Sequence, residues 1–116
     1  MRKQLIENAA FDVATQVRAV EDAIDSTLTG LAELQSRMVR ARGVMGVGPA
    51  TGQAAFEQLS VTINSLIRAR GTMVECHREL AGAKQFVPGL RTVSFGDGDD
   101  CPPATAAMPA PLRVVA

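Results

Sequence analysis

The residues best suited to chemistry are the single histidine, His77, and the two cysteines, Cys76 and Cys101. By residue type, the three together could form a zinc site, and the imidazole alone could serve as an acid or a base. Neighbouring residues on a helix point about 100° apart, so Cys76 and His77 do not easily face one ion. A disulfide would require an oxidising compartment, to which nothing in the sequence points. We therefore predict no metal and no cofactor, and His77 remains as the one candidate for chemistry.

The segment 77–83 carries a basic residue and several small residues after the histidine. In this respect it resembles histidine phosphotransfer proteins, which carry their phosphoacceptor on a long helix of a four-helix bundle. The spacing departs from the family pattern, in which a Lys-Gly pair follows closely. The resemblance implies a signalling module with His77 as phosphoacceptor, and we keep this as the alternative. We favour a partly buried histidine without a chemical role.

Two further segments contain residues that bind ligands in other proteins. Asp97, Asp99 and Asp100 could bind calcium, but no bidentate Glu follows at the spacing a calcium loop requires, so a solvated acidic turn is favoured. The glycine-rich run 43–48 lacks a preceding strand and a following Lys-Ser or Lys-Thr, so it predicts a turn and not a phosphate loop. We predict that the protein is not an enzyme.

Arginines cluster at two places, and together they could form a basic patch for nucleic acid or phosphate. In the hairpin derived below most of them face acidic residues, so salt-bridged solvent faces are favoured. Arg40 and Arg42, near the predicted turn, are the least accounted for. We predict them as possible contacts with a protein partner.

The composition favours helices packing on helices. Hydrophobic residues are 47% of the chain, yet aromatic residues are only 3%. Single-stranded nucleic-acid binders need aromatic platforms, and β-sandwiches and barrels are usually richer in aromatic residues. The formal net charge is zero, which gives no electrostatic case for nucleic acid or an anionic membrane. The sequence shows no secretory signal and no membrane-spanning segment, so we expect a cytoplasmic protein or one incorporated in a larger assembly.

The segment from about residue 4 to residue 42 predicts a long helix. Its apolar residues recur at alternating spacings of three and four, a heptad pattern that a strand cannot produce. Arg37, Arg40 and Arg42 suit the negative end of a helix, and Gly43 is the predicted C-terminal cap. The core residues predicted on this helix are Val13, Val17, Val20, Ile24, Leu31 and Leu34.

A second helix is predicted from about residue 52 to residue 86, after a turn at 43–51. Thr51 could cap its start, or Pro49 could occupy its first turn. Its apolar stripe again has helical spacing and includes His77. The core residues predicted on this helix are Phe56, Leu59, Ile63, Leu66, Met73 and Leu80.

A short connection makes the two helices antiparallel neighbours. Folding the chain near Val47 places residues opposite each other when their numbers sum to about 95. This register puts His77 opposite Val17. It also brings opposite charges together along the hairpin: Arg37 with Glu57, Asp22 and Asp25 with Arg68 and Arg70, Arg18 with Glu75, and Asp12 with Lys84.

The segment 88–116 differs in composition and predicts an extended tail rich in Pro, Gly and Asp. Two short β-prone pieces interrupt it. One of them could dock on a partner or add a strand to its sheet. The tail residues predicted as possible partner contacts are Phe95, Leu112 and Val114.

An isolated two-helix hairpin buries little apolar surface, and small domains without disulfides or metals are marginally stable. We therefore expect an all-α, coiled-coil-like hairpin that assembles into a four-helix bundle or a higher oligomer. The function that follows is a structural, assembly or adaptor protein. Its expected partners are further copies of itself and other proteins, with neither nucleic acid binding nor membrane insertion.

Overall fold

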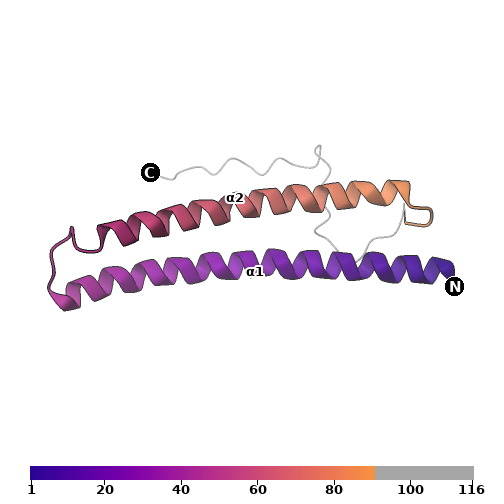
Figure 1. The fold of residues 1–116 in the computed structure, drawn as a ribbon. Helices are drawn as coiled ribbons and strands as arrows, with labels where there is room; N and C mark the ends of the chain where they lie inside the picture. The colour runs from indigo at the N-terminus through magenta and orange to yellow at the C-terminus, as the bar shows by residue number, and fades with distance from the viewer. Residues whose placement is uncertain (91–116) are drawn as a thin grey trace, which may run out of the picture.

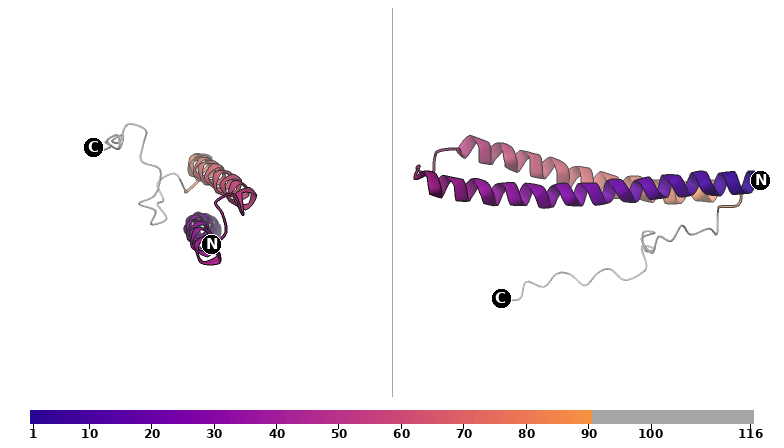
Figure 2. Two further views of the ribbon diagram at one scale, coloured as in Figure 1. Left: turned by 90° about the vertical axis from the view of Figure 1, so that its left-hand side faces the viewer. Right: turned by 90° about the horizontal axis from the view of Figure 1, so that it is seen from below.

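The computed structural model describes residues 1–90, which form two long antiparallel helices and a short helical turn (Figure 1). Helix α1 spans Arg2–Met45, helix α2 spans Gln53–Ala83, and a 3₁₀ helix, η1, spans Lys84–Phe86. This part of the chain is 87% helical and contains no strand. The predicted all-α helical hairpin is therefore confirmed. Figure 2 shows that the two helices cross at a shallow angle.

The C-terminal cap of α1 lies three residues after the predicted cap. The cap is Gly46, with a φ of 67°, and the Gly46 N–H donates to the carbonyl oxygen of Gly43 at 3.3 Å. The prediction that Gly43 caps the helix was wrong, because Gly43 lies within the helix. A glycine is tolerated in a helix at a modest cost, whereas the left-handed conformation at the end favours glycine strongly.

The connection at residues 46–52 ends on a second glycine in the left-handed region. Gly52 has a φ of 84° and is the N-terminal cap of α2, so neither Thr51 nor Pro49 begins the helix as predicted. The Thr51 N–H donates to the Gly48 carbonyl at 3.0 Å, which closes a tight turn. From the end of α1, Arg42 Nη1 donates to the Val47 carbonyl at 3.3 Å and joins the connection to the helix.

The contact between the helices is a narrow seam with a thin core. Within residues 1–90, only Leu59, at 8% exposure, and Leu90, at 4%, are buried apolar side chains. Most of the other predicted core residues lie half-buried along the seam. These half-buried residues are Val17, Val20, Ile24, Leu31, Phe56, Ile63, Leu66 and Met73.

Three predicted core residues instead lie exposed beside the seam: Val13 at 49%, Leu34 at 47% and Leu80 at 39%. Near Val13 and Leu80 the next residue, Ala14 or Ala81, takes the half-buried place. A straight α-helix has 3.6 residues per turn, so a strict heptad pattern drifts across the contact by about 20° per heptad. The predicted seam ignored this drift over a helix of 44 residues.

Candidate functional site across the helix seam

His77 of α2 meets Glu21 of α1 inside the seam. The His77 Nδ1 and Glu21 Oε1 atoms lie 2.8 Å apart, and the two side chains are 19% and 33% exposed. This is hydrogen-bond distance, and a carboxylate accepts from whichever imidazole nitrogen carries the proton. Of the two neutral tautomers of His77, the contact therefore favours the one that carries its proton on Nδ1. This tautomer leaves Nε2 as the basic nitrogen.

The register prediction placed His77 opposite Val17, one helical turn away from its actual partner. The prediction of a partly buried histidine was correct, but sequence reasoning missed Glu21. A signal was present, because Glu21 falls beside an otherwise apolar stripe, as His77 does on the second helix. Two polar residues on facing stripes gain by pairing, since a buried polar group without a partner is costly.

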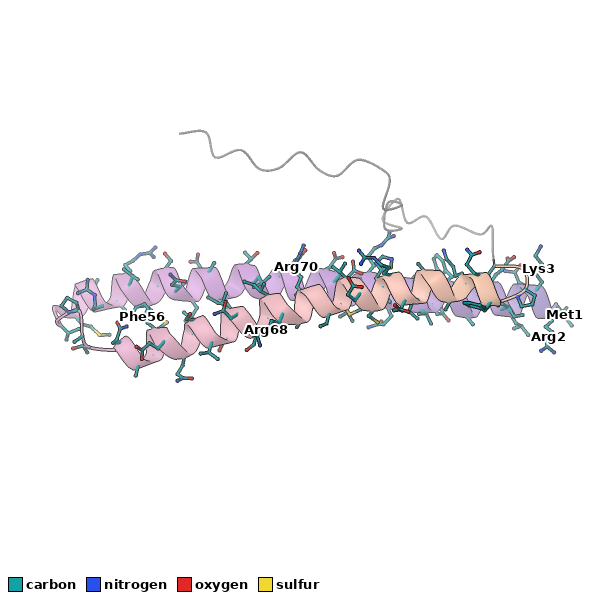
Figure 3. All side chains as sticks on the ribbon, turned by 90° about the horizontal axis from the view of Figure 1, so that it is seen from above. Met1, Arg2, Lys3, Phe56, Arg68 and Arg70 are labelled. Carbon is teal, nitrogen blue, oxygen red and sulfur yellow. The ribbon has the colours of Figure 1, made fainter. Side chains whose placement is uncertain are left out.

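Arg70 binds Asp25 one turn beyond Glu21 on α1 and two turns before His77 on α2. The Arg70 Nε atom donates to Asp25 Oδ1 at 2.8 Å, and both side chains are more than half exposed. The Asp25 carboxylate raises the pKa of Arg70, mainly through this hydrogen bond and then through Coulombic attraction. The two residue numbers sum to the predicted value of about 95, so the register is confirmed at this point. Arg68, expected to share in this contact, lies on the opposite edge of α2 (Figure 3).

The remaining arginines do not gather into one patch. Arg37 was predicted to meet Glu57, but its Nε atom donates to Glu33 of its own helix at 3.0 Å. A partner one turn away on the same helix is always within reach, whereas an exposed partner on the other helix requires two long side chains to extend. Arg40, one of the two predicted partner contacts, is exposed on α1. The second, Arg42, is half-buried and holds the connection.

Glu75 was predicted to lie near Arg18 of the other helix, but it too pairs with a residue of its own helix. Glu75 Oε1 accepts from Arg78 Nη1 of its own helix at 2.6 Å. The charge pattern therefore identified the antiparallel register, but it did not identify every pair. Local pairs compete with cross-helix pairs wherever the side chains are exposed.

A shallow groove lies between the helices near the connection, with a volume of about 250 Å³. It is open to solvent and mixes apolar and amide side chains. Phe56, near the start of α2, marks its position in Figure 3. The residues that line the groove are Gln35, Phe56, Leu59, Ser60, Ile63 and Asn64.

Residues 1–90 contain no group of three or more His, Cys, Asp and Glu side chains placed to hold an ion. Cys76 is a free, exposed thiol. Cys101, the acidic cluster at 97–100 and the predicted contacts Phe95, Leu112 and Val114 lie outside the described residues.

The contacts across the seam affect both the chemistry of His77 and the register of the two helices. Glu21 can hold the His77 ring so that Nε2 acts as a base or a nucleophile. The half-buried pair of His77 and Glu21 also disfavours a shifted register, because sliding the helices would separate two half-buried polar groups. None of the described helices is long and apolar enough to cross a membrane. No protein-family model, curated protein or solved structure matches this chain.

Proposed function

We propose that this protein is a non-enzymatic structural, assembly or adaptor protein. Its helical hairpin self-associates, and the turn or the segment after residue 90 docks on a larger complex, such as a virion or a bacterial secretion assembly. The observation that carries the proposal is the amount of aliphatic surface that the hairpin leaves in water. Val13, Leu34 and Ile67 are 49%, 47% and 52% exposed, although each lies on a helix with an apolar seam.

The energetics of a hairpin support this proposal. A chain of this size gains stability by burying apolar surface, at about 25 cal/mol per Å². One seam between two helices buries one face of each helix and leaves the flanks uncovered. Association with further helices covers these flanks and removes exposed aliphatic surface from water. The expected location is the cytoplasm or the larger assembly itself.

Analytical ultracentrifugation of the full chain tests self-association. We expect a mass of at least twice the 12.2 kDa of one chain, falling towards one chain on dilution. Circular dichroism on the same samples checks that the helices are formed. A helical monomer at every concentration would refute self-association.

Docking is tested by comparing the full chain with a chain that ends at Leu90. We expect both to oligomerise, because the described hairpin lies within residues 1–90. If the tail docks, only the full chain should capture the larger complex; if the turn docks, the truncated chain should capture it as well. A second truncated chain carrying Arg40→Ala then separates the turn from the tail. Equal capture by all variants would contradict docking through either element.

A second candidate function rests on the contact between His77 and Glu21. A carboxylate at Nδ1 leaves the lone pair of Nε2 free to attack phosphorus, as the phosphoacceptor of a signalling module requires. In the transfer, the N–P bond forms as the phosphoryl group leaves its acyl phosphate donor, and the donor departs as a carboxylate.

Incubation with radiolabelled acetyl phosphate tests this second function. A signalling module should show acid-labile label that His77→Gln removes and Arg78→Gln retains. Glu21→Gln should slow the labelling, since an amide does not stabilise the imidazolium as a carboxylate does. Absence of label in the wild-type chain would eliminate the phosphoacceptor function.

A further inference from the structure

The two flanks of the hairpin seam differ in charge. Asp25 lies one residue after Ile24 and reaches Arg70, so this flank carries ions. Ala23 lies one residue before Ile24, about 100° to the other side of the seam. On α2, Ala69 is likewise rotated by about 100° from Arg70. Because the helices are antiparallel, the flank of α1 that holds Ala23 and the flank of α2 that holds Ala69 lie on the same side of the molecule.

We call this side the neutral face. From Val13 to Leu34, every α1 residue on it is uncharged, and Asp12 lies just before this stretch. Most of these residues are small or aliphatic, and Val13 and Leu34 are the most exposed large apolar side chains among them, at 49% and 47%. The α1 residues that carry the argument are Val13, Val20, Ala23, Thr27, Gly30 and Leu34.

On α2, the flank residues around Ala69 are also uncharged from Ala55 to Cys76, and Arg68, rotated by a further 100° beyond Ala69, lies at the outer edge of this flank. Thr62, Ala69 and Cys76 recur every seven residues on this flank, and all three are exposed. Arg37 of α1 and Glu79 of α2 lie at its ends. The other flank, in contrast, carries Asp25 and further charged side chains along both helices.

From these observations we infer that the neutral face binds the neutral face of a second copy of this chain, giving a two-fold symmetric four-helix bundle. This inference rests on the proposed self-association and names its surface. A two-fold interface brings a patch against itself, so any charge on it would meet a like charge near the axis. A patch without charge over its whole length avoids this repulsion. Small side chains let helix axes approach to about 8–10 Å.

The neutral face is large enough for a specific interface with a second copy of the chain. The uncharged stretches from Val13 to Leu34 and from Ala55 to Cys76 are each about 32 Å long at 1.5 Å per residue, and each helix is about 10 Å wide. Together they offer about 600 Å² per copy, or about 1,200 Å² for the pair, which is the lower end of the size range of specific interfaces.

Two matched substitutions on α1 test the inference. Ala23→Glu puts a carboxylate on the neutral face, whereas Ala32→Glu makes the same change on the charged flank, seven residues after Asp25. Both alanines are exposed in the hairpin, so the helices should form in both variants, as circular dichroism verifies. In ultracentrifugation we expect Ala23→Glu to raise the dimer dissociation constant by about tenfold or more, because it buries two like charges in the pair. Ala32→Glu should match the wild-type chain.

Thiol alkylation gives a second readout that does not depend on mass. Cys76 lies on the neutral face and is exposed in the hairpin alone. The Cys101→Ser substitution removes the other thiol, so that only Cys76 is alkylated. Its alkylation should slow as the protein concentration rises, and Ala23→Glu should remove this protection.

The outcomes separate the inference from the proposed function. An oligomer that Ala23→Glu leaves intact, or that Ala32→Glu weakens equally, overturns the neutral face as the interface while self-association stands. A wild-type chain that is monomeric at all concentrations overturns both. If Ala23→Glu spares the dimer but abolishes capture of the larger complex, the face belongs to a different protein and the inference also fails.

Discussion

Leu59→Ala is the substitution that most directly measures what the thin core contributes. Leu59 is the one buried side chain of α2 and is 8% exposed. The change removes three carbon atoms, and at about 0.8 kcal/mol for each the transfer term is about 2.4 kcal/mol. Leu59 also lines the open groove. Its loss therefore widens an existing opening and creates no closed cavity, which keeps the cost near the lower end of the usual range of about 2–5 kcal/mol. We expect a loss of about 2.5 kcal/mol.

Val61→Ala is the matched control, two residues away on the same helix. Val61 is 56% exposed, so truncation should cost less than about 1 kcal/mol of burial. Alanine also has a better helix propensity than valine by about 0.5 kcal/mol. These contributions offset each other, and we expect a change within about 0.5 kcal/mol of zero.

Urea unfolding followed by circular dichroism at 222 nm measures both variants. All samples need the same chain concentration, because association shifts the apparent stability by mass action. The free energy of unfolding should fall for Leu59→Ala with an unchanged dependence on urea. Equal stability of the two variants would refute the placement of Leu59 in the core and, with it, the packing of the seam.

Three further changes test other parts of the fold. Ile63→Asp places a charge among half-buried apolar side chains, so helicity and oligomeric mass should both collapse; their survival would show that the register is wrong. Gly71→Ala should raise the melting temperature, because this helical glycine has space for a Cβ atom, whereas Gly46→Ala should lower it, because Gly46 has a φ of 67°. If both substitutions shifted the melting temperature in the same direction, the assignment of Gly46 as the cap of α1 would be contradicted. Asp25→Asn should leave the melting temperature unchanged within error, since its bridge to Arg70 is exposed and screened; a marked drop would mean that the pair is buried by association.

The candidate site was only partly predictable. The sequence placed His77 on the packed stripe, and it is indeed only 19% exposed in its side chain. It could not identify Glu21 as the partner, because heptad spacing alone does not distinguish registers that differ by one turn. A difference of one turn decides whether an imidazole meets a valine or a carboxylate. Arg70 and Asp25 were predictable because opposite charges recur at a sum of about 95 along much of the hairpin.

By itself, the sequence determined that the chain forms two long helices joined by a tight turn. The periodicity of the apolar residues and the absence of proline from both helical segments are local properties, and local properties are sufficient to select a helix. Where the helices end depended on which glycine adopts a positive φ, and Gly46 rather than Gly43 does so. Which aliphatic residues are covered depended on the tertiary structure. The line of contact drifts around each helix, and only the relative placement of the two axes decides that Leu59 is buried while Leu34 stays in water.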